Sequence, residues 1–154
     1  MAKVDAGLRK CIIGHTPQIH WQAIETGSTG RGIPDLNGCF RSFEIWIECK
    51  KADHWAVEVQ PEQVGWAERR VRAGGTVFCA VRRLPNDELW LLRHEALRKL
   101  REPKTGLRDL SPSLILGRWS GGPRQWAWAA FLTQVFPAIP AAIWGKGVVN
   151  PVGR

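Results

Sequence analysis

The fold is decided by two short stretches of the sequence, Gly32-Ile-Pro-Asp-Leu36 and Trp46-Ile-Glu-Cys-Lys50. The second stretch belongs to an alternating run, 43–50, whose pattern is typical of a β-strand. Successive side chains of a strand point to opposite faces, so one face of this run is wholly apolar. The other face carries the Glu48 carboxylate next to the Lys50 ammonium group. One face can therefore cover a core while the other carries chemistry.

The stretch before this strand supplies a second carboxylate. Residues 33–40 predict a strand that is joined to 43–50 by a short hairpin link, and Asp35 stands at its start. If the two strands pair, Asp35 and Glu48 come within a few ångströms of each other, and two carboxylates that close repel unless a cation lies between them. Mg²⁺ prefers carboxylate oxygen and keeps water molecules for a substrate phosphate. Lys50 would point into the same space, where it can position water or stabilise charge that develops on phosphorus.

The remaining pattern predicts a mixed α/β sheet flanked by helices, in the order α-β-β-β-α-β-β-α. A helix at 61–73 leads directly into an apolar strand at 76–81, so that strand is expected to be parallel to 43–50 with the helix as crossover. The other expected elements are a helix at 3–13 that ends at Gly14, strands at 19–24, 88–92 and 114–116, loops at 25–32 and 102–113, and helices at 94–101 and 124–136. We expect one domain over 1–136 and an irregular, Pro- and Gly-rich tail over 137–154.

Composition points to a globular protein with a polyanionic partner. The 154 residues carry a formal net charge of +8, and 15 of the 22 basic residues are Arg, which contacts phosphate in a bidentate manner. Nucleic acid is the first candidate, and a basic protein without such a partner is the alternative. No apolar run is long enough for a membrane span, and the N-terminus lacks the apolar stretch of a signal peptide, so a cytoplasmic protein is expected. The four cysteines show no CxxC spacing, which argues against a zinc knuckle and favours reduced thiols.

The order of these motifs resembles a known superfamily. Pro34-Asp35 followed by Glu48-Cys49-Lys50 resembles the PD-(D/E)xK nuclease signature. With Gln63-Val-Gly-Trp66 and Gly74-Gly75 before an apolar strand, residues 18–83 are similar to VRR-NUC and archaeal-type (Hjc-like) Holliday junction resolvases, especially small phage proteins. The resemblance implies a restriction-endonuclease-like core.

The resemblance also implies roles for matching residues. Asp35 and Glu48 would be metal ligands together with the carbonyl of Cys49, and Lys50 would be the catalytic lysine. Gln63 would reach the site from its helix and hold water or the scissile phosphate; the alternative is that it only caps the helix. The metal would be Mg²⁺, with Mn²⁺ able to replace it.

Some roles stay open at this point. The superfamily often has a further acid near the N-terminus, for which we favour Glu25 over Asp5. In the glycine loop, Ser28 and Thr29 are expected to contact the DNA backbone. The other expected DNA contacts are Arg31, Lys51, which points to the face opposite Lys50, and Arg69, Arg70 and Arg72, for which a solvated helix face is the alternative.

We therefore expect a metal-dependent endonuclease that nicks branched DNA, as a Holliday junction resolvase does. Another nuclease of the same superfamily, of the restriction or nicking type, fits the motif equally well. A non-catalytic DNA-binding module is disfavoured because it has no use for two acids that face a phosphate. A four-way junction needs two matched nicks, so a homodimer is expected. The aromatic segment with Trp119, Trp126, Trp128 and Phe131 is either a dimer surface or a cover over the sheet.

Overall fold

Strand β3 (Phe43–Ala52) lies inside a six-stranded sheet whose strand order follows the chain, β1-β2-β3-β4-β5-β6. The computed structural model describes residues 5–25 and 30–145. Only β3 and β4 run parallel, and every other neighbouring pair is antiparallel, which confirms the expected crossover and the mixed sheet. The other strands are β1 (His20–Ala23), β2 (Leu36–Phe40), β4 (Val77–Arg83), β5 (Glu88–Arg93) and β6 (Ile115–Trp119).

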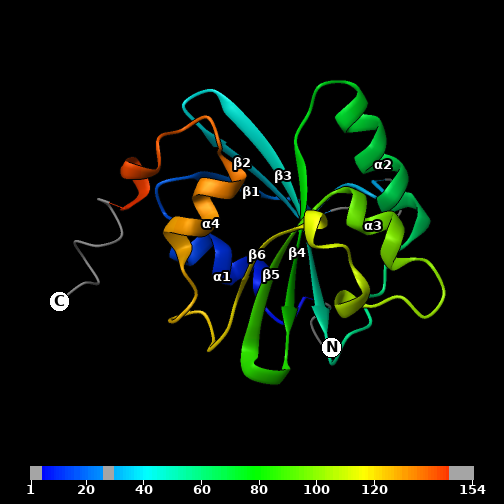
Figure 1. Ribbon diagram of the computed structural model, residues 1–154. Helices are drawn as coiled ribbons and strands as arrows, with labels where there is room; N and C mark the ends of the chain where they lie inside the picture. Colours follow the sequence, from blue (N-terminus) through cyan, green and yellow to red (C-terminus); the bar gives the residue numbers. More distant parts are fainter. Residues whose placement is uncertain (1–4, 26–29, 146–154) are drawn as a thin grey trace.

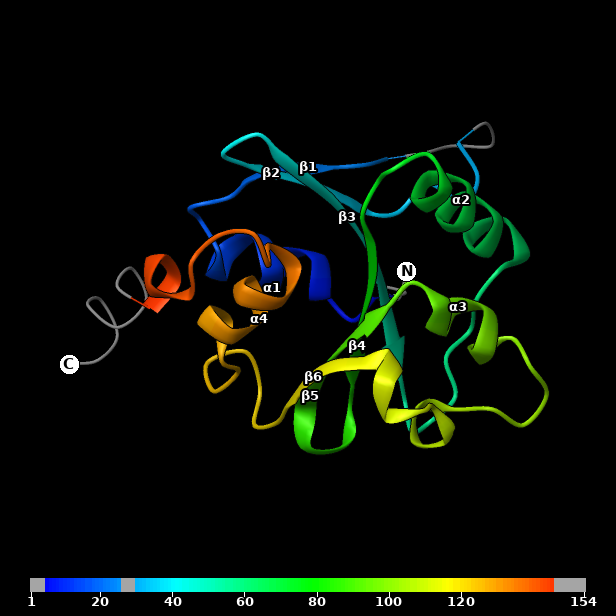
Figure 2. The ribbon, with the colours of Figure 1, turned by 45° about the horizontal axis from the view of Figure 1, so that its top comes forward.

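Helices cover both faces of the sheet (Figures 1 and 2). On one side lie α1 (Leu8–His15) and α4 (Trp128–Val135), and on the other side lie α2 (Pro61–Arg72) and α3 (Glu95–Leu100). Short 3₁₀ turns occupy Pro85–Asp87, Leu107–Asp109 and Pro112–Leu114. Among the residues that the structure describes, no helix is long and apolar enough to cross a membrane.

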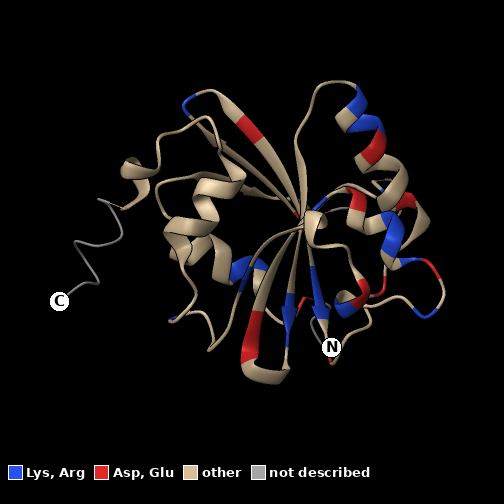
Figure 3. Cartoon of the chain, in the orientation of Figure 1, with Lys and Arg blue, Asp and Glu red and all other residues tan. Residues whose placement is uncertain are grey.

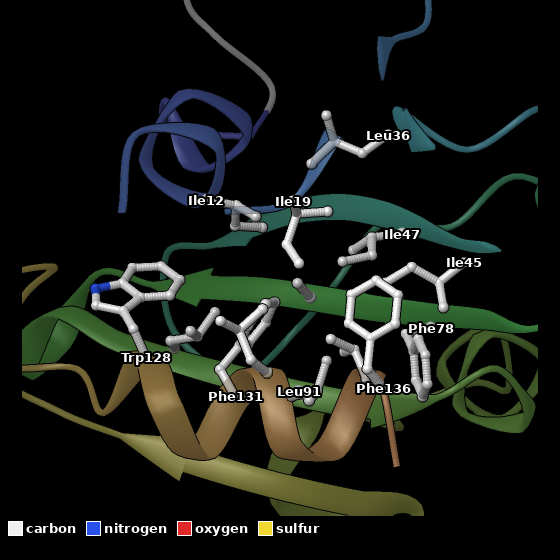
Figure 4. Close-up of a cluster of buried hydrophobic side chains, with 14 of the residues drawn as sticks. Ile12, Ile19, Leu36, Ile45, Ile47, Phe78, Leu91, Trp128, Phe131 and Phe136 are labelled. Atoms are coloured by element: carbon white, nitrogen blue, oxygen red, sulfur yellow. The ribbon is translucent and has the colours of Figure 1, made fainter. Parts of the chain in front are cut away.

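The two faces of β3 contribute to two separate hydrophobic cores. The apolar face of β3, with Ile45 and Ile47, packs beneath α1 and α4 together with Phe131 (Figure 4). The opposite face contributes to a second core beneath α2 and α3, where Trp46 packs against Trp66 with ring centroids 5.0 Å apart. The face that carries Glu48 is therefore covered by a helix and does not open broadly to solvent.

The aromatic C-terminal segment closes over the sheet. Trp126, Trp128 and Phe131 are buried in the core beneath α1 and α4. Ile139 and Trp144, which the sequence places in the irregular tail, are buried in the same core, and residues 141–145 are helical. The core thus continues beyond residue 136.

Helix α2 has well-defined ends. The Gln63 side chain accepts from the Gln60 N–H at 2.8 Å, as the N3 residue of a capping box does, and Pro61 occupies the first turn, where a missing N–H costs nothing. At the other end Gly74, with φ of +102°, donates its N–H to the Val71 carbonyl and stops the helix. Both ends match the sequence prediction within one residue.

Several predicted boundaries were wrong. The first helix begins at Leu8 rather than at residue 3, and β6 continues to Trp119 rather than ending at residue 116. Gly14 does not stop the first helix, which continues to His15 before Thr16 bonds back to the Ile12 carbonyl. The second strand begins at Leu36 rather than at residue 33. The last helix begins at Trp128 rather than at 124.

Candidate active site

Asp35 stands where β2 separates from β3. The pairing of the two strands begins at Leu36 and Ile47, so Cys49 lies beyond the end of β2. There the Cys49 N–H donates to Asp35 Oδ2 at 2.7 Å. The Cys49 side chain packs in the core beneath α1, which leaves only its backbone on the side of Asp35. The Asp35 carboxylate is thus held against the open edge of β3 by a backbone hydrogen bond.

Gln63 joins the remaining side chains of the site. Its Oε1 accepts from Lys50 Nζ at 2.8 Å and from the Gln60 N–H at 2.8 Å, and its Nε2 donates to Glu48 Oε2 at 3.0 Å. Lys50 Nζ lies 3.7 Å from Glu48 Oε2 and its side chain is only 13% exposed. One amide therefore caps helix α2 and fixes the two charged side chains of β3 relative to each other.

Burial makes the two carboxyl groups weak acids. Glu48 is 4% exposed, and desolvation together with the negative charge of Asp35 raises its pKa to about 8. Desolvation also raises the pKa of Asp35, although the hydrogen bond from Cys49 works against that shift. In the absence of a cation, the site therefore favours one retained proton over two adjacent negative charges.

These residues line a cleft of about 340 Å³. Lys51 lines it as well, although it belongs to the opposite face of β3, because the cleft opens at the edge of the strand. Sequence reasoning missed Glu58 and Gln60, which also line this cleft. The signal for Glu58 was the alternation around it, since Val57 and Val59 are buried and leave the acid between them exposed.

The donor set fits a small, hard divalent cation. Asp35 and Glu48 are the two neighbouring carboxyl groups that could hold such a cation. Among the described residues no cluster of three His, Cys, Asp or Glu side chains is close enough to hold a metal. One or two carboxylates suffice for Mg²⁺, which keeps several water molecules and binds substrate phosphates. A bound cation would also offset the negative charge of Asp35, which together with desolvation raises the pKa of Glu48.

The two candidates for the N-terminal acid occupy different surroundings. Glu25 is 82% exposed and forms an ion pair with Arg9 at 3.4 Å. Asp5 accepts from the N–H groups of Gly7 and Arg9 at the start of α1, and its charge contributes to the raised pKa of Asp35. Of the two, Asp5 is the one that acts electrostatically on the site.

The predicted DNA contacts are spread over several elements. Ser28 and Thr29 lie outside the described residues. Arg31 is 71% exposed next to the site and pairs with Glu62 at 3.5 Å, and Lys51 pairs with Asp53 at 3.3 Å.

The three arginines of α2 differ in their surroundings. Arg69 and Arg72 are exposed. Arg70 stacks over Trp66 and Trp46, with its guanidinium carbon 4.6 Å and 5.2 Å from the ring centroids. Arg70 therefore has a packing role in addition to its charge.

Comparison with known proteins gives a structural likeness and no sequence match. No family model and no curated protein matches the sequence. Among solved structures, the chain is similar to Archaeoglobus fulgidus Hjc, a Holliday junction resolvase from an archaeal hyperthermophile, with a TM-score of 0.50 at 13% identity. The match covers 64% of this chain and 81% of that one. The resemblance to VRR-NUC and to phage proteins stays a prediction. The chain has the mixed six-stranded sheet and flanking helices of the Hjc resolvase nuclease fold.

Proposed function

We propose that this protein is a metal-dependent endonuclease that hydrolyses phosphodiester bonds in branched DNA, with a four-way junction as its substrate. The observation that carries the proposal is the cluster of Asp35, Glu48, Lys50 and Gln63 in one cleft of a resolvase-like fold. All four side chains line the same space.

The chemistry follows from what each side chain can hold. A divalent cation bound by Asp35 and Glu48 would polarise a phosphate oxygen and lower the pKa of a water molecule. Lys50 offers a partly buried ammonium group that is fixed by Gln63, so its charge is available where negative charge builds on the phosphoryl oxygens. The Gln63 amide is the group that keeps Lys50 and Glu48 in place before substrate arrives.

Two features support branched DNA as the substrate. The net charge of +8 favours a polyanion, and the fold is that of a protein described as a Holliday junction resolvase. One small domain that reads shape and backbone, rather than bases, suits a junction. Two matched nicks in a nearly symmetric junction require two sites, so we further propose a homodimer with two-fold symmetry.

The test is cleavage of matched substrates. Linear duplex, flap and four-way junction DNA of the same sequence are incubated with the protein in Mg²⁺, in Mn²⁺ and in EDTA. We expect paired nicks in the junction with either metal, little cleavage of the linear duplex and none in EDTA. Equal cleavage of all three substrates would favour a nuclease of another specificity, and cleavage in EDTA would contradict metal dependence. Light scattering of the free protein and of the complex tests the homodimer.

A further inference from the structure

A groove lies between α2 and α3, separate from the cleft that holds the acids. Its volume is about 470 Å³, and its walls include Pro61, Val64 and Gly65 of α2 and, across from them, Arg98 and Arg101. The two helices lie side by side on the same face of the sheet (Figures 1 and 2). Nothing in the proposed chemistry uses this groove.

The groove and the cleft are neighbours on either side of one segment. Glu58, Gln60 and Gln63 line the cleft, whereas Pro61 lines the groove. Arg101 Nη1 donates to the carbonyl of Val59 at 2.9 Å, so an arginine of the groove contacts the backbone between two residues of the cleft. A bound polymer that leaves the cleft and passes over this segment enters the groove directly.

Two arginines, Arg98 and Arg101, line the groove, and a third, Arg69, reaches its wall at Gly65. Arg98 makes two hydrogen bonds of 2.7 Å to the Glu68 carboxylate, which fixes its plane. Arg69 Nη1 lies over Gly65, 3.0 Å from the point where a Cβ on that glycine would stand. Within the described part of the chain, neither Arg69 nor Arg101 forms an ion pair, so both charges are free to meet an anion. Glu102 also lines the groove, and it pairs with Lys99 at 3.4 Å.

The position of Gly65 supports access to this groove. A glycine inside a helix costs about 1 kcal/mol relative to alanine, so its presence in the middle of α2 calls for a reason. Gly65 has ordinary helical geometry and needs no positive φ. Because Gly65 has no side chain, the Arg69 guanidinium can lie against the helix backbone at the wall of the groove.

We propose that the groove between α2 and α3 binds the phosphate backbone of the DNA strand next to the scissile phosphate. Arg69 and Arg101 contact phosphates there, Arg98 stays paired with Glu68 at the wall of the groove, and Gly65 leaves room for the Arg69 guanidinium beside the strand. This inference rests on the proposed function, since the strand is the one that the cleft would cut. Figure 3 shows the basic residues that lie on α2 and α3.

The experiment measures binding without cleavage. Fluorescence anisotropy with labelled four-way junction DNA in EDTA gives Kd over a range of salt concentrations. We expect Arg69→Ala to lower the slope of log affinity against log salt by about 0.9 and to weaken binding roughly five- to tenfold at 0.1 M salt. Arg124→Ala, which removes an exposed arginine before α4, is the matched charge control and should leave both values nearly unchanged.

A second variant tests the groove without a change in charge. Gly65→Leu fills the floor with a good helix former, so it should weaken junction binding by a similar factor while the melting temperature stays equal or rises. Ala130→Leu, on the exposed side of α4, is its control. If wild-type protein cuts junctions and both Arg69→Ala and Gly65→Leu bind like wild type, the groove proposal is overturned and the proposed function stands. If wild-type protein neither binds nor cuts any of the DNA substrates, both proposals fail.

Discussion

Glu48 is a carboxylic acid in a place where a carboxylate is costly. It lies beneath helix α2 at 4% exposure, with a second carboxyl group beside it and a lysine 3.7 Å away. A buried carboxyl group tends to keep its proton when no metal cation is bound to it, and burial raises the pKa of Glu48 to about 8. This arrangement lowers the stability of the folded protein at neutral pH. It is typical of a residue that binds a charged ligand.

The first prediction concerns the stability of the metal-free protein. The folded pKa of Glu48, about 8, lies above the unfolded value near 4.3, so the folded state binds more protons between these values and stability falls as pH rises through this window. Glu48→Gln removes this titration. We expect it to stabilise the protein by about 1–3 kcal/mol at pH 8, which is a rise of roughly 3–10 °C in melting temperature, and to have little effect at pH 4.

Thermal unfolding in EDTA from pH 4 to pH 9 measures this difference. Addition of Mg²⁺ should raise the melting temperature of the wild-type protein at pH 8, because a bound cation stabilises the two carboxylates, and should leave the variant nearly unchanged. Identical pH profiles for the two proteins would show that Glu48 is not the buried, weakly acidic group described here.

The second prediction concerns Lys50. Gln63 fixes its ammonium group, and its role would lie in the transition state, where phosphoryl oxygens gain charge. Lys50→Ala should lower the cleavage rate by about 10²–10³ and should change junction affinity far less, because a lost donor of this kind acts mainly on the transition state. Single-turnover rates and Kd from anisotropy separate the two effects.

The control for Lys50 follows from the structure. Lys51 lines the cleft together with Lys50. A Lys51 variant would therefore not separate the loss of a positive charge from the loss of a catalytic group. Lys10, exposed on α1, is the suitable control, and Lys10→Ala should leave the rate within about twofold of wild type. A similar loss of rate in both variants would remove Lys50 from the chemistry.

At the scale of elements, the close contact between Gly32 and helix α2 positions the loop that precedes Asp35. Gly32 has φ of +86°, and a Cβ on it would stand 2.2 Å from the backbone carbonyl oxygen of Glu62 in the first turn of α2. Backbone cannot move aside as a flexible side chain can. This contact therefore sets the distance between the loop that carries Asp35 and the helix that carries Gln63.

The third prediction tests this contact. Gly32→Ala should cost roughly 2–4 kcal/mol, because it combines a positive φ with a clash against backbone, and should reduce cleavage by displacing Asp35. Gly74→Ala is the matched control, since Gly74 has φ of +102° but no neighbour within 4 Å, so it should cost only about 1–2 kcal/mol. Chemical denaturation of the three proteins gives both values, and equal costs would contradict the close packing of Gly32 on α2.

Elements with strong local signals could be predicted from the sequence, and those set by distant contacts could not. The alternation of 43–50 and the ends of α2 are local patterns, and both were confirmed. The start of the last helix was wrong because Trp126 and Trp128 donate their indole N–H groups to the carbonyls of Asp87 and Pro123, which hold residues 124–127 in a turn. No local pattern reveals such bonds.

The same distinction applies to the site. The sequence predicts Asp35, Glu48, Lys50 and Gln63 as one site, and the structure places all four in one cleft. Glu58 and Gln60 were missed because tertiary contacts position the loop that carries them. These contacts are hydrogen bonds from Arg83 to the His54 carbonyl, from the Leu107 N–H to the Trp55 carbonyl and from Arg101 to the Val59 carbonyl.

At the scale of the whole molecule, positive charge is divided between structure and binding. Arg82 forms two hydrogen bonds of 2.8 Å to Asp87, and Arg83 binds the buried carboxylate of Glu88. These arginines are bound within the fold. Arg31 beside the cleft and Arg69 and Arg101 at the groove are exposed and remain accessible for a polyanion.

The fourth prediction concerns the salt dependence of DNA binding by the wild-type protein. Each phosphate that the protein neutralises contributes a slope of about −0.9 in log affinity against log salt. We expect a total slope of roughly −3 to −6 with junction DNA, because several basic residues near the site contact phosphates together. Anisotropy between 50 and 300 mM salt measures the slope, and a flat response would exclude a phosphate backbone as the main partner.

The central claim is that Asp35 and Glu48 hold the divalent cation of a nuclease, and one measurement tests it most directly. Cleavage of a four-way junction is followed over a Mg²⁺ titration for wild-type protein, Asp35→Asn and Glu48→Gln, with binding measured in parallel in EDTA. The account predicts Mg²⁺-dependent nicks by the wild-type protein, loss of cleavage in both variants, and junction affinity that is unchanged or tighter because negative charge near DNA has been removed. Near-normal Mg²⁺-dependent cleavage by either variant would contradict the assignment of the site.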